Sequence, residues 1–378
     1  MQFDNLKYLV VGSGFFGSII AERIASDLDE KVLVIEKRNH YGGNCHSDTD
    51  SETGIEYHTY GTHIFHTSNS KVWEYINSFT AFNGYYHQVL TTYQGKVYQM
   101  PINLETINAL YGLNLRPFEA SAFIEKEIAR DRITAPSNLE EKAISLVGRP
   151  LYEAFIKGYT VKQWRRDARE LPADIITRLP VRFSYNESYY TDRWQGIPLD
   201  GYTKIFERML KSPTIRVELS VDYFQARGGI KVREKTIYSG PADQYFDFKF
   251  GRMEWRSCDF RKEIVPVEDF QGTSVMNCAD LEIPYTRTHE PRHLHEERPY
   301  QREKTVIFRE YPKDDAGESP MYPINDEKNR AVYDKYRRLM EGERGVIFGG
   351  RLADYKYYDM HHVIGRALAA FKGICDTR

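Results

Sequence analysis

The sequence predicts an α/β fold in three parts, and three observations indicate it. Close to the N-terminus, a β-rich segment, a turn, a helical segment and a second β-rich segment follow one another. Residues 101–160 then lose strand character and carry helical spacing. Short β-rich segments recur from residue 214 onward, so we expect more sheet, partly outside the first unit.

The first unit is expected to be a βαβ motif, with strands at residues 8–12 and 31–36 and a helix over residues 13–27. Gly12, Gly14 and Gly17 form a GxGxxG pattern between the first strand and the helix. Such glycines let a pyrophosphate approach backbone N–H groups at a helix N-terminus. Glu36 ends the second strand, where a carboxylate can bind ribose hydroxyls and repel a 2′-phosphate. The pattern therefore predicts a dinucleotide site.

The later elements are signalled locally. In the helical segment, residues 117–119 and 137–140 carry helix-start signals, and the second resembles a capping box. The expected later strands are residues 214–219, 229–232, 236–239, 305–309 and 345–348. A closing helix is expected over residues 360–371.

The composition excludes several classes of protein. A chain of 378 residues with 41% hydrophobic and 28% charged residues indicates a globular protein of two or three domains. A net charge of −2 without a basic cluster argues against nucleic-acid binding. The four cysteines show no CxxC spacing, and we expect neither a metal site nor disulfides. Because no signal peptide or long apolar run occurs, we expect a soluble, cytoplasmic protein without a membrane span.

Two further motifs favour FAD over NAD. Glu36, Lys37 and the later Gly42-Gly43-Asn44 resemble the corresponding segment of the flavin-binding amine-oxidase and mutase group. Residues 237–240 (Ile-Tyr-Ser-Gly) are similar to the turn that returns the chain to FAD in flavoproteins with two dinucleotide folds.

Spaced blocks across nearly the whole chain resemble the bacterial, FAD-dependent UDP-galactopyranose mutase family. They are residues 61–67 (Gly-Thr-His-Ile-Phe-His-Thr), 158–164 (Gly-Tyr-Thr-Val-Lys-Gln-Trp), 285–287 (Tyr-Thr-Arg), 310–312 (Glu-Tyr-Pro), and 350–351 with 357–360 (Gly-Arg and Tyr-Tyr-Asp-Met). The order and spacing of these blocks are more specific than any single glycine turn.

The resemblance implies an isomerase that interconverts UDP-galactopyranose and UDP-galactofuranose without net redox change. In the family mechanism, N5 of the reduced flavin forms a covalent adduct with the anomeric carbon and expels UDP. The resemblance also implies an external reductant such as NAD(P)H or a flavin reductase system, a homodimer, and a role in cell-surface polysaccharide biosynthesis.

The resemblance also implies a set of site residues. For catalysis the resemblance implies Arg178, Arg287 and His63. For substrate binding it implies Phe155, Tyr159, Thr160, Trp164, Tyr189, Arg256, Tyr322 and Tyr357. For the cofactor it implies Gly12, Gly14, Phe15, Gly17, Glu36, Lys37, Gly43, Asn44, Arg351, Asp359 and Met360.

Two groups of histidines resemble metal-binding sets, but we expect no metal at either. His63 and His66 have no acidic residue at a recognised ligand spacing, so flavin-side positioning is favoured over a metal site. For His289, His293 and His295 we expect a surface or structural use.

The chain departs from the family pattern at Arg165-Arg166, at Trp194, and where Met360 leads into His361-His362. Three alternatives stay open: the same chemistry on UDP-N-acetylgalactosamine, a flavin oxidoreductase related to amine oxidases, and a noncatalytic nucleotide-sugar-binding protein. Paired arginines argue against an amine substrate, because guanidinium groups suit a diphosphate.

Together these signals predict a discontinuous Rossmann-type FAD domain with a helical insertion and a mainly antiparallel sheet domain. The expected boundaries are 1–80, 206–245 and 330–378 for the FAD domain, 100–165 for the insertion, and 81–99 with 175–205 and 246–325 for the sheet domain.

Overall fold

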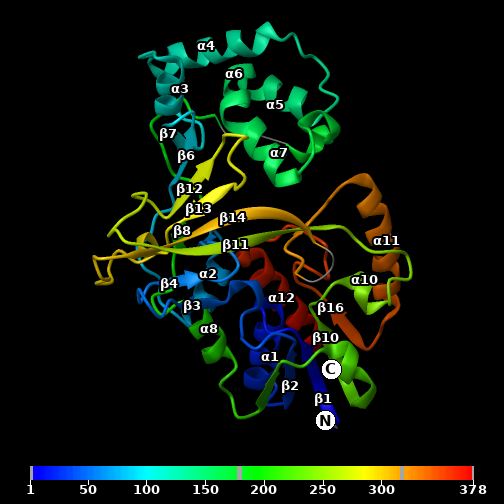
Figure 1. The fold of residues 1–378 in the computed structure, drawn as a ribbon. Coiled ribbons are helices and arrows are strands. Elements are labelled where there is room, and N and C mark those ends of the chain that lie inside the picture. The colour runs from blue at the N-terminus through cyan, green and yellow to red at the C-terminus, as the bar shows by residue number, and fades with distance from the viewer. Residues whose placement is uncertain (1–2, 177–180, 316–318, 377–378) are drawn as a thin grey trace.

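A parallel five-stranded sheet forms one end of the molecule, with strand order β16-β10-β1-β2-β9 (Figure 1). Its strands are β1 (Phe3–Val11), β2 (Val32–Glu36), β9 (Ile215–Leu219), β10 (Ile230–Tyr238) and β16 (Val346–Phe348). All five residues of β2 are buried, as expected for a central strand covered on both faces. Since β9 follows β2 by more than 170 residues, this unit is discontinuous in the sequence, and the predicted α/β fold class is confirmed.

The structure is a computed structural model and describes residues 3–176, 181–315 and 319–376. Helix α1 (Phe15–Asp27) packs against α12 (Met360–Asp376) beside the parallel sheet. Ile19, Ile24 and Ile364 are fully buried in the largest apolar cluster. The two strands predicted at 229–232 and 236–239 are in fact one strand, β10. Polar residues interrupt its apolar pattern and its register with β1 shifts between Val232 and Lys235, but the strand itself continues from Ile230 to Tyr238.

A seven-stranded sheet occupies the middle of the molecule, with order β15-β11-β14-β13-β12-β6-β7. Its strands are β6 (Val89–Tyr93), β7 (Lys96–Met100), β11 (Trp255–Val265), β12 (Val275–Cys278), β13 (Arg287–His289), β14 (Thr305–Asp315) and β15 (Tyr322–Pro323). Every pairing is antiparallel except that of β12 with β6. Strands β11 and β14 form a long ribbon that crosses the molecule above the parallel sheet.

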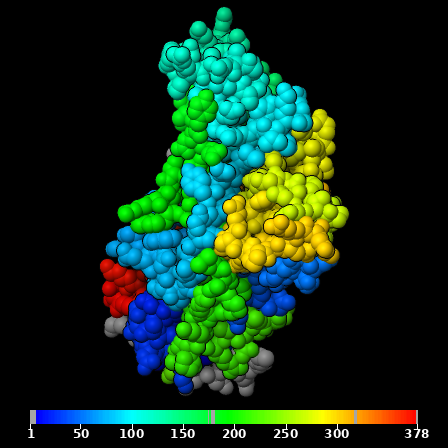
Figure 2. Space-filling view, turned by 90° about the vertical axis from the view of Figure 1, so that its left-hand side faces the viewer, coloured from blue at the N-terminus to red at the C-terminus, as the bar shows by residue number. Residues whose placement is uncertain are grey.

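A group of helices forms the opposite end (Figure 2). It contains α3 (Leu104–Tyr111), α4 (Pro117–Arg130), α5 (Leu139–Val147), α6 (Arg149–Leu151), the π-helix η2 (Tyr152–Lys157) and α7 (Gly158–Trp164). Asn103 and Asn138 cap α3 and α5 with their side chains, as short polar residues do at helix starts. This group has its own apolar cluster, which includes Ile144, Leu151 and Tyr152.

The remaining elements connect these units or flank them. They are η1 (Gly43–Cys45), β3 (Ser47–Thr49), β4 (Glu56–His58), β5 (Phe65–Thr67), α2 (Ser70–Asn77), η3 (Ala168–Glu170), η4 (Ala173–Ile175), β8 (Trp194–Gly196), α8 (Tyr202–Met209), α9 (Tyr223–Ala226), η5 (Arg227–Gly229), α10 (Ala242–Tyr245), η6 (Pro291–Leu294) and α11 (Glu327–Gly342). Among the described residues, no helix is both long enough and apolar enough to cross a membrane.

Candidate active site

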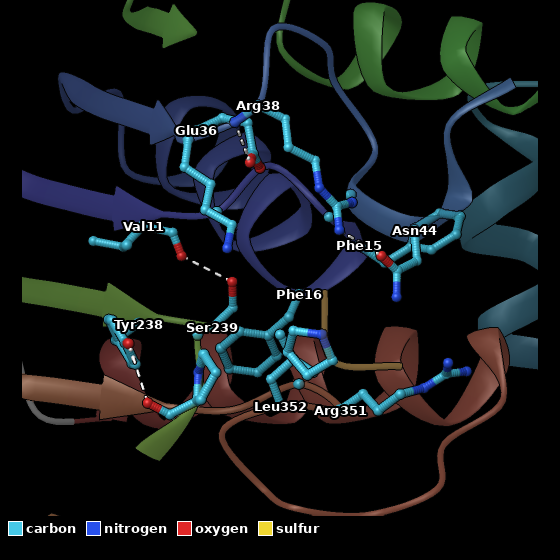
Figure 3. Close-up of a pocket in the computed structure, with 18 of the residues that line it drawn as sticks. Val11, Phe15, Phe16, Glu36, Arg38, Asn44, Tyr238, Ser239, Arg351 and Leu352 are labelled. Atoms are coloured by element: carbon cyan, nitrogen blue, oxygen red, sulfur yellow. Dashed lines mark hydrogen bonds between the residues drawn. The ribbon is translucent and has the colours of Figure 1, made fainter. Parts of the chain in front are cut away.

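A glycine turn joins β1 to α1 and opens onto a cavity at the carboxyl end of the parallel sheet (Figure 3). Gly12 has a φ of 99°, and a Cβ there would lie 2.3 Å from Ser239 Oγ. A Cβ on Gly17 would lie 2.0 Å from the Gly12 carbonyl oxygen, so this glycine lets α1 approach β1. Gly14 caps α1 without a side-chain hydrogen bond, and the first turn has no acidic residue. The amides of this turn are therefore suited to an anion.

Glu36 is held at the end of β2 beside the same turn. The Ser13 backbone N–H and hydroxyl donate to Glu36 Oε2 at 2.9 and 3.0 Å, and the Arg38 N–H donates to Oε1 at 3.0 Å. A carboxylate has about four acceptor positions, so it can still accept from a ribose hydroxyl. Ser13 and Arg38 were missed at the sequence level because their roles depend on the fold of the turn.

Strand β10 closes the cavity on the other side. Ser239 Oγ donates to the Val11 carbonyl at 2.8 Å, which holds the end of β10 against the end of β1 (Figure 3). This point lies between two strands whose connections run in opposite directions, where open α/β sheets bind ligands. Arg351 lies across the cavity and donates to the Tyr358 carbonyl at 2.6 Å.

Most of the residues predicted for the cofactor line this cavity. They are Gly12, Gly14, Phe15, Glu36, Lys37, Gly43, Asn44, Arg351 and Met360. Gly17 packs behind the turn, and Asp359 lines a second cavity instead. A Cβ on Gly43 would approach Gly14 Cα at 3.4 Å, so the two glycines leave a backbone cradle without side chains.

The second cavity adjoins the first and is lined by histidine, tyrosine and arginine. His63, Arg351 and Met360 line both cavities. The second cavity also contains the predicted residues Arg287, Tyr189, Tyr322 and Tyr357. A ligand in the first cavity and a ligand in the second would therefore meet at the three shared residues.

Arg287 is positioned by its two neighbouring strands. On β13 it lies opposite Asn277 of β12 and Glu310 of β14. Its Nε donates to Asn277 Oδ1 at 3.1 Å, its Nη1 lies 3.7 Å from Glu310 Oε2, and its Nη2 donates to the hydroxyl of Tyr159 on α7. Burial alone would raise the Glu310 pKa, but the positive charge of Arg287 and a hydrogen bond with His289 hold it at about 2. This buried carboxylate fixes the charge and position of the arginine.

His289 corrects the sequence prediction for the histidine cluster. It is buried, lines the second cavity, and contacts Glu310 Oε2 at 3.2 Å and Thr62 Oγ1 at 2.8 Å. Its surroundings come from β14 and from the loop after β4, which local spacing cannot reveal. His293 and His295 do have structural roles, bonding to Asp269 and Glu297.

Two tyrosines and an arginine form one wall of the second cavity. The rings of Tyr322 and Tyr357 stack with centroids 5.5 Å apart, and the guanidinium of Arg351 lies 5.7 and 5.5 Å from their centres. Tyr357 is nevertheless 65% exposed, and Tyr189 is 41% exposed. Both residues are therefore accessible to a ligand.

His63 is neutral and has a defined tautomer. Its Nδ1 lies 2.6 Å from the Gly61 carbonyl, which only accepts, so Nδ1 carries the proton and Nε2 has a free lone pair. Burial and the nearby positive charge of Arg351 lower its pKa to about 4. At neutral pH it can therefore accept a hydrogen bond but cannot supply a charge.

His87 is a further neutral histidine, and it lines the second cavity. It was not among the residues predicted from the sequence. Burial lowers its pKa to about 3, and its Nδ1 pairs with the Tyr85 hydroxyl at 2.9 Å. Since the unfolded chain binds a proton near pH 6.5 and the folded chain does not, stability is lost as pH falls from 6.5 toward 3. We expect the free energy of unfolding of His87→Gln to fall less steeply with decreasing pH, by up to about 1.4 kcal/mol per pH unit. The measurement is denaturant unfolding at several pH values. Equal slopes in the two proteins would contradict a buried neutral His87.

The helical side of the site differs from the prediction. Phe155 was expected on one helix face with Tyr159, but the helix is a π-helix from Tyr152 to Lys157, where residues four apart do not align as in an α-helix. Phe155 is 5% exposed and packs edge-on against Tyr98 at 5.0 Å, so it lines neither cavity. Thr160 is also buried.

Arg256 is bonded to protein groups rather than free for a ligand. Its Nε and Nη2 donate to the Gln163 carbonyl at 3.1 and 2.7 Å, and its Nη1 pairs with Asp314. It thus ties the end of α7 to β11. Lys162 fastens the same helix from the other side, since its ammonium donates to the carbonyls of Cys278, Asp280 and Tyr285 at 2.8 to 3.0 Å. Neither anchoring role is indicated by residue type or spacing.

The last predicted positions are Trp164, Trp194 and Arg178. Trp164 lines a third hollow, together with Arg165 and Arg166, that borders the glycine-rich cavity at Pro241 and Gln244. Trp194, one of the positions that depart from the family pattern, stacks on Trp73 with ring centroids 5.6 Å apart. It lines neither of the two cavities nor the third hollow. Arg178 lies outside the described residues.

Comparisons with known proteins agree with this arrangement. A model of the UDP-galactopyranose mutase family matches residues 154–357, and a model of NAD(P)-binding Rossmann-like domains matches residues 10–79. The chain is 38% identical to a probable UDP-galactopyranose mutase of Klebsiella pneumoniae, over 97% of this chain and 94% of that one. It is 37% identical to the dTDP-fucopyranose mutase of Escherichia coli, over 96% of both chains.

A solved structure shows the same fold. The crystal structure of a reduced UDP-galactopyranose mutase superimposes with a TM-score of 0.75 over 99% of this chain and 96% of that one, at 14% identity. The family model and the relative at 38% identity confirm the family resemblance inferred from the spaced blocks. The chain belongs to the UDP-galactopyranose mutase family and is an enzyme of the isomerase class.

Proposed function

We propose that this enzyme interconverts UDP-galactopyranose and UDP-galactofuranose, with FAD in the glycine-rich cavity. The observation that carries the proposal is that the cavity containing Arg287 shares His63, Arg351 and Met360 with the glycine-rich cavity. A redox cofactor and a sugar diphosphate would therefore meet at one place. The family assignment supplies the reaction class, and the cavities supply a place for each reactant.

The residues of the first cavity fit FAD. The cradle of Gly12, Gly14 and Gly43 suits a pyrophosphate, and Glu36 suits an adenosine ribose. When bound in its reduced form, the flavin would supply the N5 nucleophile that displaces UDP from the anomeric carbon. The reductant, NAD(P)H or a reductase system, and a homodimeric state are further parts of this proposal.

The residues of the second cavity would bind and orient the substrate. Arg287, with Arg178, would bind the diphosphate and stabilise the negative charge that develops on leaving UDP. The hydroxyl groups of Tyr189, Tyr322 and Tyr357 would donate to the same phosphates. His63 Nε2 would accept a hydrogen bond from a sugar hydroxyl and thereby orient it.

We further propose that Tyr159 contacts the uracil, with Thr160 and Trp164 on the same side of the substrate. Phe155 would reach the base only if the π-helix rearranged. Arg256 would act through α7, by holding the helix that carries Tyr159. The domain boundaries that the sequence predicts are also part of this proposal.

The test is to incubate dithionite-reduced protein anaerobically with UDP-galactofuranose and to follow UDP-galactopyranose by chromatography. A matched sample kept oxidised is the control. Conversion in the reduced sample alone is the expected result. Conversion at equal rates in both samples, or protein purified without flavin, would contradict the proposal.

A second candidate substrate is favoured by one comparison. The E. coli dTDP-fucopyranose mutase is about as similar to this chain as the Klebsiella relative is. The same assay should therefore include the furanose forms of dTDP-fucose and of UDP-N-acetylgalactosamine. The largest kcat/KM identifies the substrate, while flavin reduction by an amine would indicate an oxidoreductase.

A further inference from the structure

Three side chains that the sequence did not link lie together beside the second cavity, and two of them, His66 and Asp359, line it. His66, Asp359 and His361 each offer one ligand atom, and these atoms lie within 4.8 Å of one another. His66 comes from β5, whereas Asp359 and His361 come from the start of α12. From this arrangement we propose that His66, Asp359 and His361 form a binding site for a divalent transition-metal ion of the zinc type.

The donor set is that of a transition-metal site. Two imidazoles and one carboxylate are common zinc ligands, and a site with three protein ligands keeps a fourth position for water or a ligand. Around a tetrahedral zinc ion the ligand atoms lie about 3.3 Å apart. His66 Nε2 and Asp359 Oδ2 are 3.9 Å apart, and every pair of ligand atoms in the group lies within 4.8 Å, so the side chains would have to move closer together around the ion.

His66 is oriented by a second carboxylate, as metal-binding histidines usually are. Its Nδ1 lies 2.7 Å from Asp192 Oδ2, so Nδ1 carries the proton and Nε2 presents its lone pair toward Asp359. Ser68 Oγ donates to the other Asp192 oxygen at 2.8 Å. Tyr190 stacks on the His66 ring at 3.8 Å and fixes its plane. The first ligand is therefore preorganised.

His361 has an unused nitrogen. Its Nδ1 is buried and has no hydrogen-bond partner among the described residues. A buried polar atom without a partner is costly, and coordination of a cation would satisfy it. The ring lies edge-on to His66, with centroids 4.9 Å apart. His361 is also one of the positions where this chain departs from the family pattern.

The other group with metal-ligating side chains does not share these features. Asp269, Glu290 and His293 also lie together on the loop between β11 and β12 and after β13. However, both Glu290 oxygens accept from the backbone amides of Phe270 and Gln271, and His293 already bonds to Asp269. The side chains of this group stabilise the loop, so the metal-site proposal is restricted to His66, Asp359 and His361.

The test measures metal binding directly and does not require enzyme turnover. Flavin-loaded protein is stripped with a chelator, titrated with Zn²⁺ by calorimetry, and analysed for bound zinc by mass spectrometry after dialysis. We expect one ion per chain. His361→Gln should weaken binding by at least about tenfold, and Asp192→Asn should weaken it by about ten to one hundredfold.

Two variants serve as controls. His293→Gln removes the histidine of the other group, and Cys375→Ala removes the exposed thiol. Both should bind zinc as the parent does, and the flavin absorbance of every variant reports that the fold is retained. Failure to retain one ion, equal affinity in His361→Gln, or loss of binding in Cys375→Ala would each overturn the proposal. None of these outcomes depends on which sugar nucleotide the enzyme uses.

Discussion

Replacing Arg287 with alanine is expected to lower kcat/KM by about 10²–10³, because it removes a preorganised charge-assisted donor for the diphosphate. The same change leaves the buried Glu310 carboxylate without its arginine, which is expected to cost about 2–3 kcal/mol of stability. The measurements are steady-state kinetics with reduced enzyme and thermal unfolding.

A double variant separates the two effects. Arg287→Ala with Glu310→Gln removes the stranded charge, so most of the stability should return while turnover stays low. Arg309→Ala is a matched control, since Arg309 adjoins Glu310 on β14 but pairs with Glu263 in a partly exposed ion pair. Its effect on stability should stay below about 1 kcal/mol. If Arg287→Ala retained full turnover, Arg287 would not act in the diphosphate site.

Replacing Gly17 with alanine is expected to give protein that lacks flavin and unfolds at a lower temperature. The new Cβ would lie 2.0 Å from the Gly12 carbonyl oxygen and 2.8 Å from Val10 Cγ1. Because one of these atoms belongs to the backbone, α1 must move away from β1, and the glycine turn must deform with it. We expect destabilisation of about 3 kcal/mol, measured by thermal unfolding, with the flavin content read from the visible absorbance.

Gly365→Ala is the matched control for this variant. Gly365 lies inside α12, and its added Cβ would approach only Val72 Cγ2, at an ordinary contact distance of 3.8 Å. A glycine in a helix interior costs about 0.5–1 kcal/mol relative to alanine, so this variant should keep its flavin and unfold at a higher temperature. A flavin-loaded Gly17→Ala protein of parental stability would contradict the close packing of α1 on β1.

The first unit could be predicted from the sequence because its signals are local. The apolar runs of β1 and β2, the glycine turn and Glu36 all fall within the first 36 residues, and short connections leave few ways to arrange them. The predicted break of β10 into two strands was wrong, since polar residues interrupt the apolar pattern and the register with β1 shifts there, but the strand continues through both.

The candidate site could be predicted only in part. The resemblance supplied Arg287 and the tyrosines of the second cavity, and the structure places them around one space. The roles of Phe155 and Arg256 were not foreseen correctly. Phe155 packs in the core of the helical group because its segment is a π-helix, and Arg256 donates to a carbonyl at the end of α7. Neither the π-helix nor the contact between Arg256 and α7 can be recognised from residue types or their spacing.

The sequence by itself determined a parallel α/β unit with a dinucleotide-binding turn, because backbone freedom at glycine and strand periodicity act over a few residues. Only the tertiary structure decided that Glu310 and Tyr159 hold Arg287, and that His66 faces Asp359 and His361. These partners come from different strands and helices. Their meeting depends on strand register and on the packing of α7 and α12, which are set by the whole core rather than by any local segment.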